Sequence, residues 1–296
     1  LDRTGLILSI FEQRAQTREA KAQVELARCE YELPRLKGAW THLERQGGGV
    51  GLRGGPGETQ IEVDRRMIRT RISQLKRELA HLEQVRKTQR EGRPQGLPRV
   101  ALVGYTNAGK TSLLKALTGE GEPRDLLFAT LDTTTRKAWL GQDFNLETGE
   151  GGSEPKHCLV ADTVGFIRKL PHQLVAAFRS TLGEVRTADA LVVVADAAHP
   201  DLEDHLKVVG ATLRDIGCQP EGIDAQPRLL VMNQVDRLHR PQRLDLKKRH
   251  PGAVQTCAIQ GAGLDEIRLW MRELIPGPPK PRVLEAWELP EPVPTH

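Results

Sequence analysis

Apolar positions in the first third of the chain recur at helical spacing. Residues 3–45 carry apolar or small side chains that step by three and four from Ala22 onward, which predicts one long helix with a heptad seam. Pro34 falls inside this pattern and should kink the helix or loosen a turn, because proline lacks an amide hydrogen. A second seam follows a capping box at residues 59–62 and uses Ile61, Ile68, Ile72, Leu75, Leu79 and Leu82.

The two seams most simply pair as an antiparallel helical hairpin, although a dimeric coiled coil would bury the same positions. Residues 46–57 connect them, and seven of these twelve residues are glycine. A helical hairpin needs only about 2–5 linking residues, so this loop is longer than closure demands. It could mould to a partner, with nearby arginines meeting phosphates, or it could be an unstructured surface loop. The arginines are Arg53, Arg65, Arg66, Arg69 and Arg71.

A glycine- and proline-rich linker at residues 91–98 marks a domain boundary. Beyond it, short apolar runs alternate with helical patterns, which is typical of an α/β fold with a doubly wound, mostly parallel sheet. The runs lie at residues 100–103, 159–161, 191–195 and 229–232. The sequence therefore predicts a helical hairpin domain over residues 1–90, an α/β domain over 99–275 and a proline-rich tail over 276–296.

Composition narrows the class of protein. The chain has 296 residues, of which 38% are hydrophobic and 28% charged, so it can form a core and is not wholly disordered. No run approaches the roughly 18 apolar residues of a membrane span. The cysteines are far apart and the histidines lack metal-ligand spacing, which argues against a disulfide scaffold or a structural zinc site. The chain starts at Leu1 inside a helical pattern, so we expect a fragment.

Positive charge is concentrated near the amino terminus. Residues 1–99 hold 20 Lys and Arg against 13 Asp and Glu, whereas residues 100–296 hold 23 against 26. The excess in the first part lies within residues 45–99. This asymmetry favours a polyanion as a partner for that end of the molecule, although a solvated helix face would have the same composition.

A phosphate-binding pattern, G-x-x-x-x-G-K-[ST], follows the first apolar run and precedes a helical stretch. Amides of such a turn and of the helix start surround phosphate oxygens. Lys110 would reach the β- and γ-phosphates, and the Thr111 hydroxyl would ligate Mg²⁺. The pattern consists of Gly104, Tyr105, Thr106, Asn107, Ala108, Gly109, Lys110 and Thr111.

Two further segments suit the γ-phosphate and the metal. Asp162, Thr163, Val164 and Gly165 follow the second apolar run, where the Asp suits the Mg²⁺ shell and the Gly165 amide can approach a phosphate. Between the two motifs lie Phe128, Ala129, Thr130, Leu131 and Asp132. A threonine there can complete the Mg²⁺ shell only while the γ-phosphate is present, which makes it a switch. An ordinary start of a strand would also be rich in threonine.

Two more segments indicate which base the nucleotide carries. Asn233, Gln234, Val235 and Asp236 stand where guanine-specific NTPases carry N-K-x-D. The Asp carboxylate there accepts from the guanine N1–H and the N2 amine, a pair of donors that adenine does not have. Cys257, Ala258 and Ile259 match the position of an S-A-K loop, in which a backbone amide meets the guanine O6. Asp236 therefore favours GTP over ATP.

In order and arrangement these motifs resemble the TRAFAC-class GTPases, and residues 1–275 resemble the HflX family of ribosome-associated GTPases. Agreement is closest at residues 1–4, 47–60, 104–111, 128–132 and 162–167. The resemblance implies a GTPase that binds GTP and GDP, takes Mg²⁺ at Thr111 and Thr130, and uses Lys110, Thr130 and Gly165 in catalysis. Family members carry a further N-terminal α/β subdomain, which we do not expect in this chain.

The resemblance also implies partners and a location. In the family, the hairpin and its glycine loop enter the large (50S) ribosomal subunit near the peptidyl-transferase region, and stalled ribosomes are split. We therefore expect the large subunit and its rRNA as partners and a cytoplasmic location, or an organellar matrix if a transit peptide precedes this fragment. A hairpin paired with itself favours a monomer.

Three positions depart from standard GTPases. Phe166 stands where many carry a water-orienting glutamine, so hydrolysis should be slow unless the ribosome stimulates it. Gln234 replaces a lysine whose stem covers the base and whose ammonium contacts the phosphate-binding loop, and Ile259 replaces another lysine. We expect weaker nucleotide affinity, with the guanine preference kept by Asp236.

Three functions remain open at this point. The first is a GTPase that remodels the ribosome, and the second is a slow-turnover, GTP-dependent rRNA-binding or assembly checkpoint module. The third is an ATPase with a coiled-coil dimer arm, against which Asp236 and the order of the motifs argue.

Overall fold

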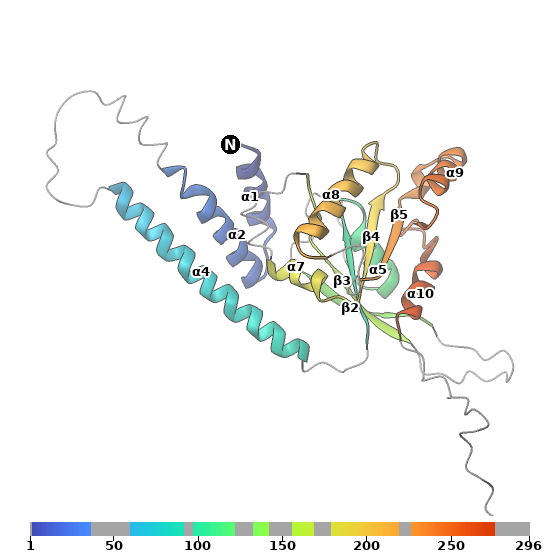
Figure 1. Cartoon of the computed structure of the whole chain (residues 1–296), viewed down its shortest axis with the longest axis horizontal. Coiled ribbons are helices and arrows are strands. Elements are labelled where there is room, and N and C mark those ends of the chain that lie inside the picture. Colours follow the sequence, from blue (N-terminus) through green and yellow to red (C-terminus); the bar gives the residue numbers. More distant parts are fainter. Residues whose placement is uncertain are drawn as a thin grey trace, which may run out of the picture.

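The computed structural model describes residues 2–36, 60–91, 97–121, 133–141, 156–168, 179–218 and 226–275 (Figure 1). The first part of the chain is helical, with α1 (Arg3–Arg14), α2 (Arg18–Glu32) and α4 (Gln60–Glu91). The strands that follow are β1 (Arg99–Gly104), β2 (Thr134–Trp139), β3 (His157–Asp162), β4 (Ala190–Asp196), β5 (Arg228–Asn233) and β6 (Val254–Gln255). Around them lie α5 (Lys110–Thr118), α7 (Arg179–Arg186), α8 (Leu202–Asp215), α9 (Arg240–Arg249) and α10 (Leu264–Glu273).

The strands form one sheet in the order β2-β3-β1-β4-β5-β6. Every neighbouring pair is parallel except β2 with β3. Parallel pairing brings the carboxyl ends of β1, β3 and β5 to the same edge, which is where ligands bind in doubly wound folds. The expected α/β fold with a mostly parallel sheet is confirmed.

Both faces of the sheet are covered, and β1 shows why. Its side chains alternate between the two faces, as successive residues of a strand must. Ala101 and Val103 join a buried cluster that includes residues of α1, α2, α7 and α8. Val100 and Leu102 join a second cluster that includes residues of α5 and α10. The near-continuous apolar runs of the sequence reflect this burial on two sides.

The α2 and α4 helices run antiparallel and pack along much of α2 (Figure 1). Leu75 of α4 is buried with Ala22 and Leu26 of α2, so the two seams meet within one chain. Arg71 donates to both carboxylate oxygens of Glu25, at 2.6 and 2.7 Å, and Arg18 pairs with Glu78 at 2.6 Å. These ion pairs lie at the exposed margin of the contact between the two helices.

The expectation of one helix over residues 3–45 is wrong. The chain leaves the helix after Arg14 and starts again at Arg18, where the Thr17 hydroxyl accepts from the Ala20 amide at 3.1 Å. Phe11 of α1 is fully buried in the cluster that contains Val185 and Leu213. The α2 helix contributes to that cluster with one side and pairs with α4 through other residues.

The α2 helix ends at Glu32, before Pro34. Proline has no amide hydrogen and cannot make the next helical hydrogen bond. Trp40, Leu43, Thr59 and the glycine-rich loop lie outside the described residues. Within the described part of the chain, no helix has a long apolar stretch of the kind that crosses a bilayer.

Replacing Leu75 should loosen the contact between α2 and α4. Leu75 has 1% of its surface exposed, whereas Met67 on the same helix is 64% exposed. We expect Leu75→Ala to lower the free energy of unfolding by about 2–5 kcal/mol, through lost burial and a residual cavity. Met67→Ala is the control and should change it by less than about 0.5 kcal/mol. Equal effects of the two variants in urea unfolding would contradict the described packing.

Candidate nucleotide-binding site

The turn between β1 and α5 forms the centre of the site. Gly104 ends β1 against the backbone of β4, where an added Cβ would lie 2.1 Å from the Val194 carbonyl oxygen. Gly109 precedes α5 with a φ of 89°, a left-handed conformation that favours glycine. The amides at the start of α5 therefore open toward the sheet edge, in the arrangement that binds anions at a helix N-terminus.

The Lys110 ammonium group is buried beneath this turn. Its Nζ donates to the carbonyl oxygens of Gly104 at 3.3 Å and Tyr105 at 3.0 Å. Burial lowers the pKa of Lys110 to about 8, and the nearby Asp162 carboxylate partly opposes that shift. Two carbonyl contacts satisfy the charge only in part, so an anionic ligand at this position would be strongly stabilised by Lys110.

The segment after β3 lies directly beside this turn. The Thr111 hydroxyl and Asp162 Oδ2 are 2.6 Å apart, and the Thr163 hydroxyl donates to the Leu102 carbonyl oxygen at 2.7 Å. A Cβ added to Gly165 would lie 2.8 Å from the Thr106 Cα and 3.1 Å from Lys110 Nζ. Glycine at position 165 is therefore required for the two segments to approach so closely.

Phe166 joins the same two segments through its backbone and points its side chain elsewhere. Its amide donates to the Gly104 carbonyl at 3.0 Å, and its carbonyl accepts from the Thr106 amide at 2.9 Å. The phenyl ring is 2% exposed and belongs to the buried cluster that contains Phe11 of α1. The residue at the position of a water-orienting glutamine thus anchors the site to the helical part of the chain.

Tyr105 adds a link that the sequence did not indicate. Its ring stacks on the His205 ring of α8, with centroids 3.6 Å apart, and its hydroxyl accepts from the Arg168 amide at 3.1 Å. The Arg168 carbonyl in turn accepts from the Arg3 side chain at 2.5 Å. Only the tertiary structure places these four residues together, since no spacing in the sequence relates them.

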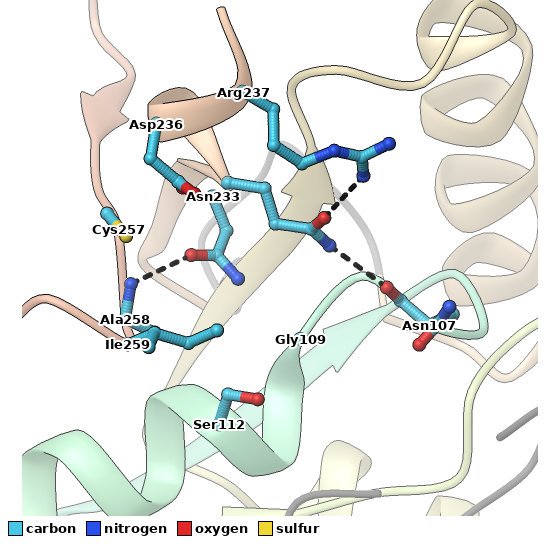
Figure 2. Close-up of a pocket in the computed structure, with 10 residues that line it drawn as sticks. Asn107, Gly109, Ser112, Asn233, Asp236, Arg237, Cys257, Ala258 and Ile259 are labelled. Atoms are coloured by element: carbon cyan, nitrogen blue, oxygen red, sulfur yellow. Dashed lines mark hydrogen bonds between the residues drawn. The ribbon is translucent and has the colours of Figure 1, made fainter. Parts of the chain in front are cut away.

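A cavity of about 630 Å³ opens beside the phosphate-binding turn (Figure 2). Asn233 joins its walls, because its side chain donates to the Ala108 carbonyl at 3.0 Å and accepts from the Ala258 amide at 3.1 Å. The cavity is lined by Asn107, Gly109, Ser112, Asn233, Gln234, Asp236, Arg237, Cys257, Ala258 and Ile259. Two segments singled out for base recognition therefore share a cavity with the phosphate-binding turn.

Within this cavity Asp236 and Cys257 interact. Burial raises the pKa of the Cys257 thiol, and its hydrogen bond to the Asp236 carboxylate raises it further, so the thiol stays protonated and donates. Ile259 is 87% exposed at the rim. Ser112 and Arg237 also line the cavity but were missed by sequence reasoning. Arg237 follows the base motif directly, which is the one signal that could have drawn attention to it.

The structure thus brings together residues 104–111, 162–165, 233–236 and 257–259 at one edge of the sheet. Val164 is buried behind the phosphate-binding turn and Val235 beneath the base motif, so their side chains pack rather than face the cavity. The segment with Phe128, Ala129, Thr130, Leu131 and Asp132 lies outside the described residues.

The fold and the site define the chain as a P-loop protein of the GTP-binding class, and comparisons with known proteins agree. Residues 14–93 match the family model "GTP-binding GTPase Middle Region", and residues 99–234 match "50S ribosome-binding GTPase". A GTP-binding protein from the archaeon Sulfolobus solfataricus, solved with GDP, is 28% identical over 93% of this chain and 72% of its own, with a TM-score of 0.52.

Curated relatives identify the family. The GTPase HflX of Magnetococcus marinus is 46% identical over 93% of this chain and 60% of its own length. The GTPase HflX of Flavobacterium psychrophilum is 51% identical over 80% of this chain and 52% of its own length. The GTPase HflX of Escherichia coli is 45% identical over 94% of this chain and 62% of its own length. The chain belongs to the HflX family of GTPases. It spans between half and two thirds of the length of these relatives.

A side chain at position 165 should disrupt the phosphate site. We expect Gly165→Ala to weaken binding of a fluorescent GTP analogue by tenfold or more, because the new methyl group would overlap the backbone at Thr106. Gly183→Ala on α7 is the matched control, since nothing lies within 4 Å of its added Cβ. Fluorescence titration of both variants would test this, and equal affinities would contradict the close approach.

Proposed function

We propose that this chain binds GTP and GDP and hydrolyses GTP. The observation that carries the proposal is the single cavity in which Asn233 and Asp236 adjoin the phosphate-binding turn. Guanine carries its two donors, N1–H and the N2 amine, beside the O6 acceptor on one edge, which suits a carboxylate beside a backbone amide. Lys110 and the amides before α5 suit phosphates. The guanine preference follows from Asp236, as adenine has no matching pair of donors.

The oxygen donors beside the turn fit a magnesium ion. The Thr111 hydroxyl and the Asp162 carboxylate lie side by side, and Mg²⁺ prefers oxygen ligands and retains several waters. Thr111 would hold the ion directly, Asp162 would hold it through water, and Thr130 remains a proposed ligand while the γ-phosphate is present. When bound, the ion neutralises charge that develops on the phosphates.

Lys110 and Gly165 have distinct proposed roles in hydrolysis. Lys110 stabilises negative charge on the β- and γ-phosphates, because it is buried and can exchange carbonyl contacts for phosphate oxygens. The Gly165 amide contacts the γ-phosphate and signals its presence. No hydrogen-bonding side chain occupies position 166, and the buried Phe166 ring cannot orient water, so intrinsic hydrolysis is slow.

We further propose that the large ribosomal subunit and its rRNA are the partners, and that the chain acts on stalled ribosomes. The matched family description, "50S ribosome-binding GTPase", supports the partner. The basic excess of residues 45–99 supports an RNA surface, although Arg71 is engaged with Glu25. The buried Phe166 ring also favours a second candidate, an rRNA-binding checkpoint with slow turnover.

Asp236→Asn should change the base that the cavity accepts. The amide can accept only one of the two guanine donors, so we expect GTP affinity to fall by about 10- to 150-fold, since hydrogen bonds to charged groups contribute about 1.5–3 kcal/mol each. Xanthosine triphosphate, which carries an oxygen in place of the amine, should gain affinity. Asp245→Asn, on the exposed surface of α9, is the control. Unchanged GTP affinity would remove the basis of the guanine preference.

Large ribosomal subunits should accelerate single-turnover GTP hydrolysis. We expect about 10³-fold, the lower end of the acceleration that activating proteins give other GTPases. Small subunits at the same concentration are the control. Sedimentation of whole ribosomes with GTP, GDP or a non-hydrolysable analogue then separates the two candidates, because splitting produces free subunits and a checkpoint does not. A rate of GTP hydrolysis that neither subunit changes would contradict the proposed partner.

A further inference from the structure

Gln234 keeps a contact that the sequence suggested was lost. Its side-chain Nε2 donates to the Asn107 carbonyl oxygen of the phosphate-binding turn at 3.2 Å. The backbone at Gln234 has a φ of 62°, which aims the side chain across the mouth of the cavity. The amide therefore spans the gap that a lysine at this position crosses in standard guanine sites.

Arg237 hydrogen-bonds to the oxygen of the same Gln234 amide. Its Nη1 donates to Gln234 Oε1 at 2.7 Å and lies 3.3 Å from Asp196 Oδ2 at the end of β4. The glutamine can satisfy both neighbours in only one orientation, with its oxygen toward the guanidinium and its nitrogen toward the carbonyl. Asp196 is fixed in turn, because its other oxygen accepts from the Ala198 amide at 2.9 Å.

We propose that Gln234 and Arg237 together replace the lysine of the N-K-x-D motif, and that Arg237 is a positioning residue for guanine nucleotides. Glutamine supplies the stem beside the base and the bond to the phosphate-binding turn. Arginine supplies the positive charge and locks the amide, since a neutral amide alone would rotate freely between its neighbours. Hydrogen bonds that involve a charged group are stronger than neutral ones, so this chain of contacts is stiffer than a lone glutamine.

The charges around the cavity make this pairing specific. An ammonium at position 234 that reached the Asn107 carbonyl would lie close to the Arg237 guanidinium, which is 2.7 Å from the present Gln234 oxygen. The two cations would repel, so lysine at 234 and arginine at 237 are alternatives rather than additive contributors. The inference rests on the proposed binding of guanine nucleotides and concerns affinity, because neither side chain reaches the phosphate-binding amides before α5.

Fluorescence titration with a labelled GDP tests the pair. Arg237→Ala and Gln234→Glu should each weaken binding about fivefold to tenfold; the glutamate keeps the shape but cannot donate to the Asn107 carbonyl. Gln234→Lys should restore affinity in the Arg237→Ala background and should give no gain when Arg237 is present. Steady-state kinetics should show higher KM for GTP with unchanged kcat, because contacts to the base do not differ between ground and transition states.

Arg240→Ala is the matched control, because Arg240 is an exposed arginine three residues further along that does not line the cavity. Thermal melting of each variant separates lost affinity from lost stability. Additive effects of Gln234→Lys and Arg237→Ala, or full affinity in Arg237→Ala, would overturn the inference while leaving guanine binding in place. A wild-type chain that binds no labelled GDP would overturn both the proposed function and this inference.

Discussion

The parallel pairing of β1 with β3 and β4, and of β4 with β5, is the constraint on which the site depends. Each of β1, β3 and β5 ends in a functional segment, and parallel register delivers all three to the same edge. An antiparallel neighbour would carry its segment to the opposite edge. The strands tolerate this arrangement because both faces are buried, which the apolar character of their residues allows.

The phosphate-binding turn is held from two sides at that edge. On one side, Phe166 pairs with Gly104 and Thr106 through its backbone and buries its ring in the cluster shared with α1. On the other, Asn233 and Gln234 bind the carbonyls of Ala108 and Asn107. The turn is therefore attached both to the cluster that contains residues of α1 and to the base motif.

At positions 234 and 166 the chain departs from standard GTPases, and the structure changes how each departure is interpreted. From the sequence, loss of a lysine predicts weaker affinity, because one long cationic side chain is missing. In the structure, the neighbouring Arg237 donates to the Gln234 side chain, and the Gln234 side chain donates to the phosphate-binding turn. At position 166 the sequence shows only that a hydrogen-bonding group is absent, whereas the structure gives the phenyl ring a packing role.

The class of fold, the phosphate-binding turn and the segments after β3 and β5 could all be predicted from the residues alone, because they depend on local patterns: apolar runs, glycines at turns and motif spacing. It missed the break at Thr17 and the contacts of Tyr105 with His205 and Arg168. Both features depend on how distant segments pack together. Helical periodicity continues across a short break, and stacking between residues 100 positions apart leaves no trace in a single sequence. The same holds for Arg237, whose role depends on an aspartate from a different strand.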